Sequence, residues 1–125
     1  MNGMFFGAES FNQDIGSWDT RKVTNMGDLF WNAYSFDQDI GDWNTNNVTN
    51  MQQLFLRAEY FNQNLSAWNT SKVTTMWRMF ESAVNFDQTI SGWDVLIVTI
   101  CNSFSLNSGI ESQPSKKPNF TSCSE

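Results

Sequence analysis

The sequence predicts an α/β solenoid, a right-handed stack of about four to five coils in which each coil carries a short parallel β-strand and a short helix. The main observation is that a step of 25 residues aligns the chain with itself. A period of roughly 20 to 50 residues is typical of stacked units that contact mainly their neighbours. The clearest columns are Phe11/Phe36/Phe61/Phe86, Trp18/Trp43/Trp68/Trp93 and Val23/Val48/Val73/Val98.

The repeat divides the chain into a predicted solenoid at residues 1–106 and a tail. The solenoid comprises a half coil at 1–10 and units at 11–35, 36–60, 61–85 and 86–106. Residues 107–125 are rich in Ser, Asn, Pro and Lys and are predicted to form a C-terminal cap and polar tail. The half coil leaves Met4, Phe5 and Phe6 uncovered, so we expect further repeats or a partner chain against the N-terminal face. Whether the chain is a fragment of a longer array is left open.

The first element of each coil is a strand expected over residues 14–18. The pair Asp19-Thr20 follows it and is a turn-forming signal that recurs as Asn44-Thr45 and Asn69-Thr70. Equivalent strands would lie in parallel at about 4.8 Å and pair their backbone groups between coils.

The second element is a helix expected over residues 25–34, 50–59 and 75–84. Met26, Leu29, Phe30 and Ala33 follow the i, i+3, i+4, i+7 pattern of one helix face. Thr24 or Asn25, just before this run, would cap the free amides at its start.

Composition places the chain in the class of single folded domains. It has 125 residues, of which 40% are apolar, with eleven Phe and six Trp. The net charge of −6 combines thirteen acidic with seven scattered basic residues, so nucleic acid is not an expected partner. No apolar run approaches the roughly 18 residues that cross a bilayer, and no signal-peptide pattern opens the chain.

Few residues suited to catalysis are present. The chain has no histidine and no glycine-rich phosphate loop, and its two cysteines are far apart. The column Asn12, Asp37, Asn62 and Asp87 alternates Asn with Asp, and a calcium ladder is the alternative to its structural role. Asp14 and Asp39 are neighbouring carboxylates of another column, for which a glycosidase pair is the alternative. The sequence therefore predicts no enzyme, no catalytic residues, no metal site and no cofactor.

Candidate partner-binding residues are the large aromatic side chains outside the repeated core columns. Aromatic side chains that the core does not use are typical anchors of protein interfaces. The alternative is that they shield the edges between neighbouring helices. The candidates are Trp31, Tyr34, Tyr60 and Trp77, together with Phe6 at the N-terminal end.

Two further patterns bear on the compartment. A bridge between Cys101 and Cys123 would fix the tail to the last coil, and the alternative is a free, buried Cys101. Asn-X-Ser/Thr sites, candidate glycan acceptors in a secreted eukaryotic chain, occur at Asn47, Asn64, Asn69 and Asn119.

The repeat unit itself resembles a known family. The stretch FNQDIGSWDTRKVTNMGDLFWNA and the equivalent segments of the next two units are similar to the BspA-type surface-protein repeat, a leucine-rich-repeat-like unit. The resemblance covers residues 1 to about 104, and Val95 and Ile100 depart from it in the fourth unit.

The resemblance implies an LRR-like solenoid at the cell surface or outside the cell. It also implies a non-enzymatic role in adhesion or in recognition of a protein or glycan ligand. The alternative function is a structural linker subunit held permanently in a larger assembly.

Overall fold

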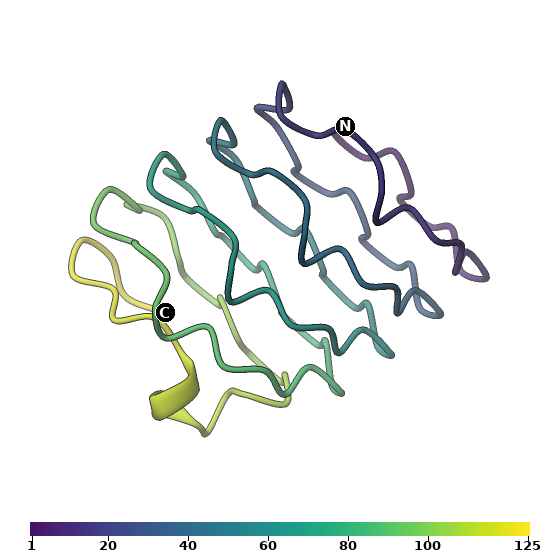
Figure 1. Ribbon diagram of the computed structural model, residues 1–125. Helices are drawn as coiled ribbons and strands as arrows, with labels where there is room; N and C mark the ends of the chain where they lie inside the picture. Colours follow the sequence, from purple (N-terminus) through teal and green to yellow (C-terminus); the bar gives the residue numbers. More distant parts are fainter.

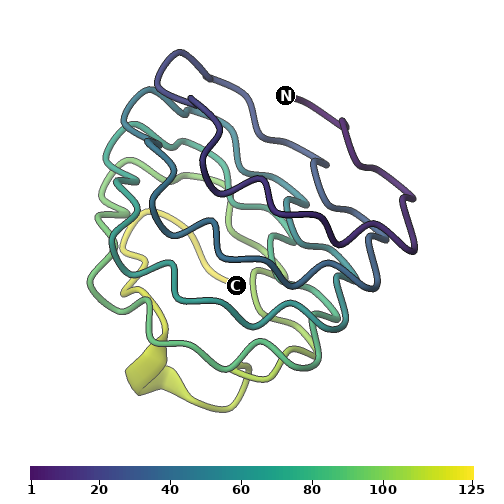
Figure 2. The same cartoon turned by 45° about the vertical axis from the view of Figure 1, so that its right-hand side comes forward.

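A computed structural model describes residues 1–125, and the chain forms a stack of successive coils that lie side by side from the N-terminal to the C-terminal end (Figures 1 and 2). Residues 25 positions apart lie over one another. The indole rings of Trp43 and Trp68 are stacked with centroids 6.5 Å apart, and those of Trp68 and Trp93 with centroids 6.3 Å apart.

The prediction of an α/β solenoid is wrong. The only helix is the short 3-10 helix η1 (Pro114–Lys116), which lies outside the repeats. The structure has no sheet, and the coils share only isolated parallel bridges, namely Asn25–Asn50, Asn50–Thr75 and Thr75–Ile100. The helices expected at 25–34, 50–59 and 75–84 and the strands expected at 14–18 and its equivalents do not form. The leucine-rich-repeat and solenoid descriptions are therefore corrected to a stack of irregular turns.

Where helices were expected, alternate amides form hydrogen bonds along the stack. The N–H groups of residues 26, 28, 30 and 32 donate to the carbonyls of residues 50, 52, 54 and 56, at 2.9 to 3.0 Å. The amides between them close tight turns, as when Ala33 N–H donates to the Phe30 carbonyl at 3.0 Å. Each amide thus finds a partner without the i to i−4 bond of an α-helix.

The turns require left-handed backbone at two positions in each coil. Asp28 and Asn32 have φ values of 60° and 59°, each as the third residue of a turn, where type II geometry needs positive φ. The N-terminal half coil has Gly3 and Gly7 at the same two positions.

The expected helix cap and strand have other roles. Asn25 Oδ1 accepts a hydrogen bond from Gly27 N–H at 2.8 Å, which makes a local turn rather than a helix cap. Within the predicted strand, Trp18 N–H donates to the Ile15 carbonyl at 3.2 Å, and this turn is incompatible with an extended strand.

The core is a set of side-chain columns that run along the stack. Phe30 and Phe55 stack with centroids 5.6 Å apart, and Phe36 and Phe61 with centroids 5.8 Å apart. Three tryptophans, at positions 43, 68 and 93, each donate their indole N–H to a carbonyl of the preceding coil at 3.0 Å.

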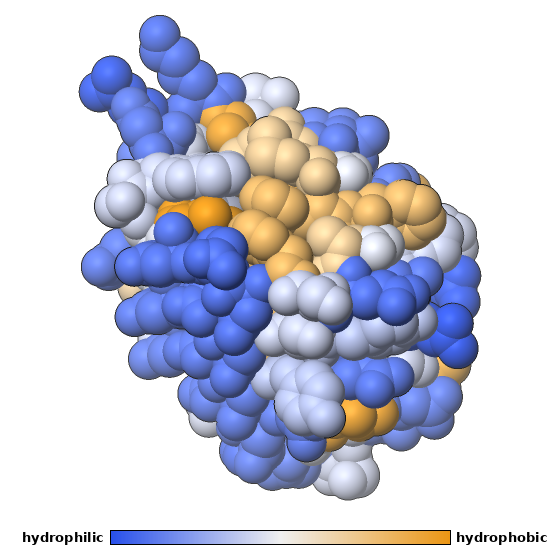
Figure 3. Space-filling view, turned by 90° about the vertical axis from the view of Figure 1, so that its right-hand side faces the viewer, coloured by the Kyte–Doolittle hydropathy of each residue, from blue (hydrophilic) through white to orange (hydrophobic).

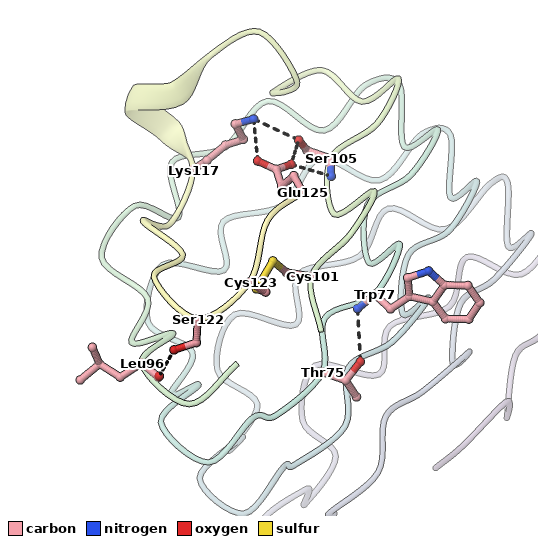
Figure 4. The surroundings of a disulfide bond; sticks show 9 residues. All are labelled: Thr75, Trp77, Leu96, Cys101, Ser105, Lys117, Ser122, Cys123 and Glu125. Carbon is pink, nitrogen blue, oxygen red and sulfur yellow. Dashed lines mark hydrogen bonds and ion pairs between the residues drawn. A yellow bond between two sulfur atoms is a disulfide. The ribbon is translucent and has the colours of Figure 1, made fainter. Parts of the chain in front are cut away.

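The tail covers the C-terminal end of the stack (Figure 4). Cys101 and Cys123 form a disulfide, and Phe120 packs edge-on against Phe104 at 5.0 Å. The Glu125 carboxylate accepts hydrogen bonds from the N–H and hydroxyl of Ser105, and Lys117 pairs with it at 2.9 Å.

The tail also extends a polar column. Gln113 donates its side-chain amide to Asp87 at 2.8 Å, and Lys116 pairs with the same carboxylate at 2.6 Å. These two hydrogen bonds hold the pKa of Asp87 below its usual value, with the Lys116 bond making the larger contribution.

The one helix of the chain is a three-residue segment, so the structure holds no helix with the length and apolar character needed to cross a membrane.

Candidate functional site

The turn segments of neighbouring coils share a surface, which we call the turn face, although some of its positions, among them Gly27, Gln53, Leu56 and Ile110, are buried. It consists of residues 27, 28, 31, 32, 34 and 35 and of those at steps of 25 residues from them. Its columns vary greatly between coils, for one of them contains Phe6, Trp31, Leu56, Glu81 and Leu106. The column at Gln38, Gln63 and Gln88 is constant, because each of these amides donates to the neighbouring coil.

All five aromatic residues proposed from the sequence lie on the turn face. Phe6 and Trp31 touch, with ring centroids 4.8 Å apart. Tyr34 is half-buried and Tyr60 is exposed, and the Tyr60 N–H donates to the Tyr34 carbonyl at 3.2 Å. The half-buried Trp77 lies beside Arg78, whose guanidinium carbon is 5.5 Å from the ring centroid. The alternative of shielding between helices has no basis here, because no helices flank these side chains.

A first hollow of about 180 Å³ lies beside the Phe6–Trp31 contact, with Gly3 and Asp28 completing its lining. The Oδ1 atom of Asp28 is buried without a hydrogen-bond partner, as is that of Asn32, which does not line this hollow. Burial raises the pKa of the Asp28 carboxyl. Because buried polar atoms in folded proteins are nearly always paired, these two acceptors are exceptions in this chain.

A second hollow of about 320 Å³ lies on the other side of Trp31. Its remaining lining residues are Leu56, Arg57, Arg78, Glu81 and Ser82. Arg78 and Glu81 form a two-pronged ion pair, with nitrogen to oxygen distances of 2.6 and 2.7 Å. This hydrogen bonding to Glu81 raises the pKa of Arg78. Arg57 is exposed and makes no ion pair.

The two arginines of this hollow occupy unfavourable backbone conformations. Arg57 and Arg78 have φ values of 57° and 52°, in the left-handed region that favours Gly, Asn and Asp. Such a conformation costs on the order of 1 kcal/mol and is often found at functional sites. Sequence reasoning missed both arginines. The signal that would have revealed them is that their columns begin with Gly3 and Gly7.

A second candidate surface is the N-terminal end of the stack, where Figure 3 shows a hydrophobic area. Met1, Phe5, Phe11 and Val23 are only partly buried there. Trp18 is 42% exposed, whereas Trp43, Trp68 and Trp93 are buried. The indole N–H of Trp18 makes no hydrogen bond, whereas that of Trp43 donates to the Ile15 carbonyl.

The remaining predicted positions are spread over the surface. The four candidate glycan acceptors, Asn47, Asn64, Asn69 and Asn119, are exposed. Asn47 also donates to the Arg21 carbonyl at 2.8 Å. Asp14 and Asp39 each accept the N–H of a glycine two residues on, at 3.0 and 2.9 Å. No group of three or more potential metal-ligating side chains occurs in the structure.

Comparison with known proteins gives one match. A family model described as "Mycoplasma protein of unknown function, DUF285" matches residues 1–116. No curated protein and no solved structure matches the chain.

Proposed function

The chain belongs to the DUF285 family, and we propose that it is a non-enzymatic recognition or adhesion module that binds a protein ligand through the turn face. The observation that carries this proposal is the contrast between a constant core and a variable outer surface. Stacked repeat proteins use such surfaces for binding, because the core fixes the backbone while the outer positions are free to vary.

The chemistry of the turn face supports the proposal. Phe6 and Trp31 provide an accessible aromatic anchor, and hot spots of protein interfaces are rich in Trp, Tyr and Arg. Asp28 lines the hollow beside this anchor. The second hollow, which we call the Arg57 hollow, lies on the other side of Trp31. An apolar centre flanked by polar groups is the usual anatomy of a protein interface.

We propose an extracellular or cell-surface location for this module. The Cys101–Cys123 disulfide supports it, because disulfides persist in oxidising compartments. The resemblance to BspA-type repeats points the same way and stays a prediction.

The proposal is tested by site-specific photo-cross-linking. A photoreactive phenylalanine analogue replaces Trp31 on the turn face or, as a matched control, the exposed Asn46 outside it. We expect a specific protein to cross-link at position 31 and not at position 46. A Trp31→Ala chain should then bind that identified protein about tenfold or more weakly. Equal cross-linking at both positions, or unchanged affinity of the Trp31→Ala chain, would contradict the proposal.

The apolar surface formed by the exposed Trp18 and the partly buried Met1, Phe5 and Phe11 favours a second candidate function, that of a structural subunit held in a larger assembly. Its partner would be a surface with the chemistry of a repeat coil, offering apolar side chains and a carbonyl for Trp18. Such a partner should remain bound at high salt, because burial of apolar surface is not screened by ions. A Trp18→Glu chain should no longer bind this partner, because the substitution places a charge in the apolar surface. A partner released by salt, or retained by Trp18→Glu, would exclude this role.

A further inference from the structure

We propose that the Arg57 hollow receives a carboxylate, the side chain of an Asp or Glu in the protein ligand. This inference deepens the proposed function and rests on it, since it names the chemistry that the turn face selects.

Arg57 supplies the uncommitted charge of the hollow. Arg78 is held by Glu81 through two hydrogen bonds of 2.6 and 2.7 Å, so its charge is already matched. Arg57 has no acidic group within ion-pair distance and makes no side-chain hydrogen bond, although the chain contains thirteen acidic residues. A free guanidinium at a hollow is suited to a carboxylate, which it can bind with two parallel hydrogen bonds.

The walls of the hollow would strengthen that pair. Trp31 and Leu56 form its apolar side, and Leu56 is 2% exposed. An ion pair against apolar groups is screened less by water than one on an open surface. Ser82 adds a hydroxyl, which can donate to a second carboxylate oxygen.

The same charge count favours a carboxylate over a phosphate group. Once Glu81 has matched Arg78, the hollow offers one net positive charge. A phosphate monoester carries close to two negative charges at neutral pH and would also lie near the Glu81 carboxylate. A single carboxylate matches the available charge.

The backbone at position 57 provides a way to separate binding from folding. Because Arg57 has a φ of 57°, replacement by glycine removes the charge and suits the conformation at the same time. An Arg57→Gly chain should therefore be at least as stable as the parent while losing the carboxylate site. An Arg57→Gln chain removes the charge with a side chain of similar length.

The test uses NMR of the full, disulfide-bonded chain with two capped pentapeptide probes, Ala-Leu-Glu-Leu-Ala and Ala-Leu-Gln-Leu-Ala. We expect the glutamate peptide to shift the Trp31 indole and Arg57 Nε–H signals and the glutamine peptide to leave them unchanged. Arg57→Gly and Arg57→Gln should each reduce the Trp31 response at least tenfold. The matched control is Arg21→Gln, which removes an exposed arginine paired with Asp19 outside the turn face, and it should respond like the parent.

Several outcomes would overturn the inference. They are an absent response to the glutamate peptide, an equal response to both peptides, an unchanged response in the Arg57 variants, or tighter binding of inorganic phosphate. Failure here is distinguishable from failure of the proposed function. A ligand that cross-links at position 31 but binds Arg57→Gly as tightly as the parent would refute the carboxylate site alone.

Discussion

At the scale of single residues, the tryptophan column shows how one position stabilises the stack in two ways. The rings of Trp43, Trp68 and Trp93 pack face to face, and each indole N–H is paired with a backbone carbonyl of the preceding coil. That carbonyl also accepts the backbone N–H that closes a turn within its own coil, so the indole is its second donor. The column therefore supplies both apolar burial and hydrogen-bond satisfaction between coils.

Replacing Trp68 by Phe should lower the free energy of unfolding, since it removes the indole donor of the Ile40 carbonyl, which then keeps only the Trp43 N–H. The loss of one hydrogen bond costs about 0.5 to 1.5 kcal/mol, and lost packing adds to this. Trp18→Phe is the matched control, because Trp18 is 42% exposed and donates no such bond, and it should cost less than about 0.5 kcal/mol. Urea unfolding of both chains measures the difference, and equal losses would refute this role of the indole N–H.

The aromatic candidates for binding were accessible to sequence reasoning, whereas the arginines were not. Trp31 and Trp77 can be recognised in the sequence because they are large and because the equivalent positions of the other coils hold different residue types. Arg57 and Arg78 cannot be recognised in this way, because a charged residue outside the core is ordinarily a solvated one. Gly3 and Gly7 in the same columns indicate their left-handed backbone, but only the structure shows that both arginines line one hollow with Trp31.

At the scale of elements, the turn segment explains why the helix prediction failed. Met26, Leu29, Phe30 and Ala33 point inward both in a helix and in this series of turns, so the apolar pattern fits either. The two differ in the partner of each amide, which for Phe30 is the Leu54 carbonyl. A hydrogen-bond partner 24 residues away cannot be recognised from the local pattern of apolar residues. Stacking of the coils here overrides the local helix propensity.

The left-handed positions of the turn can be tested with a matched pair of glycines. Gly7 has a φ of 70°, and a Cβ added there would meet no atom within 4 Å. Gly7→Ala should therefore destabilise the chain by roughly 1 to 2 kcal/mol through its backbone alone.

Gly92 is the control for this effect, since its surroundings are equally open but its φ is not in the left-handed range. Gly92→Ala should be neutral or stabilising by up to about 1 kcal/mol, because alanine restricts the unfolded chain. Thermal unfolding of both variants gives the comparison. A Gly7→Ala chain as stable as Gly92→Ala would argue against a strained turn.

The C-terminal tail is the other element with a clear physical role. The disulfide closes a loop with a sequence separation of 22, and such a bond typically stabilises by about 2 to 4 kcal/mol. The free energy of unfolding of a Cys101→Ala, Cys123→Ala chain should fall by about this amount. The Ser105 N–H, which donates a hydrogen bond to the Glu125 carboxylate, should exchange faster in that chain. Unchanged exchange at Ser105 would show that the tail stays in place without the disulfide.

At the scale of the whole molecule, the 25-residue repeat predicted that equivalent residues lie over one another, and the stacked rings show this. It did not predict what connects the coils, which is a ladder of turn amides and side chains with isolated bridges in place of a sheet. The two ends of the stack also differ. A tail with a disulfide covers the last coil, while the first coil presents an apolar surface (Figure 3).

In this chain turns, rather than helices, stack coil upon coil. The most direct test is the NMR scalar coupling across hydrogen bonds, which identifies the carbonyl that accepts each amide. The amides of Asp28, Phe30 and Asn32 should couple to the carbonyls of Gln52, Leu54 and Leu56. Coupling of the Phe30 amide to the Met26 carbonyl, as in an α-helix, would contradict the account.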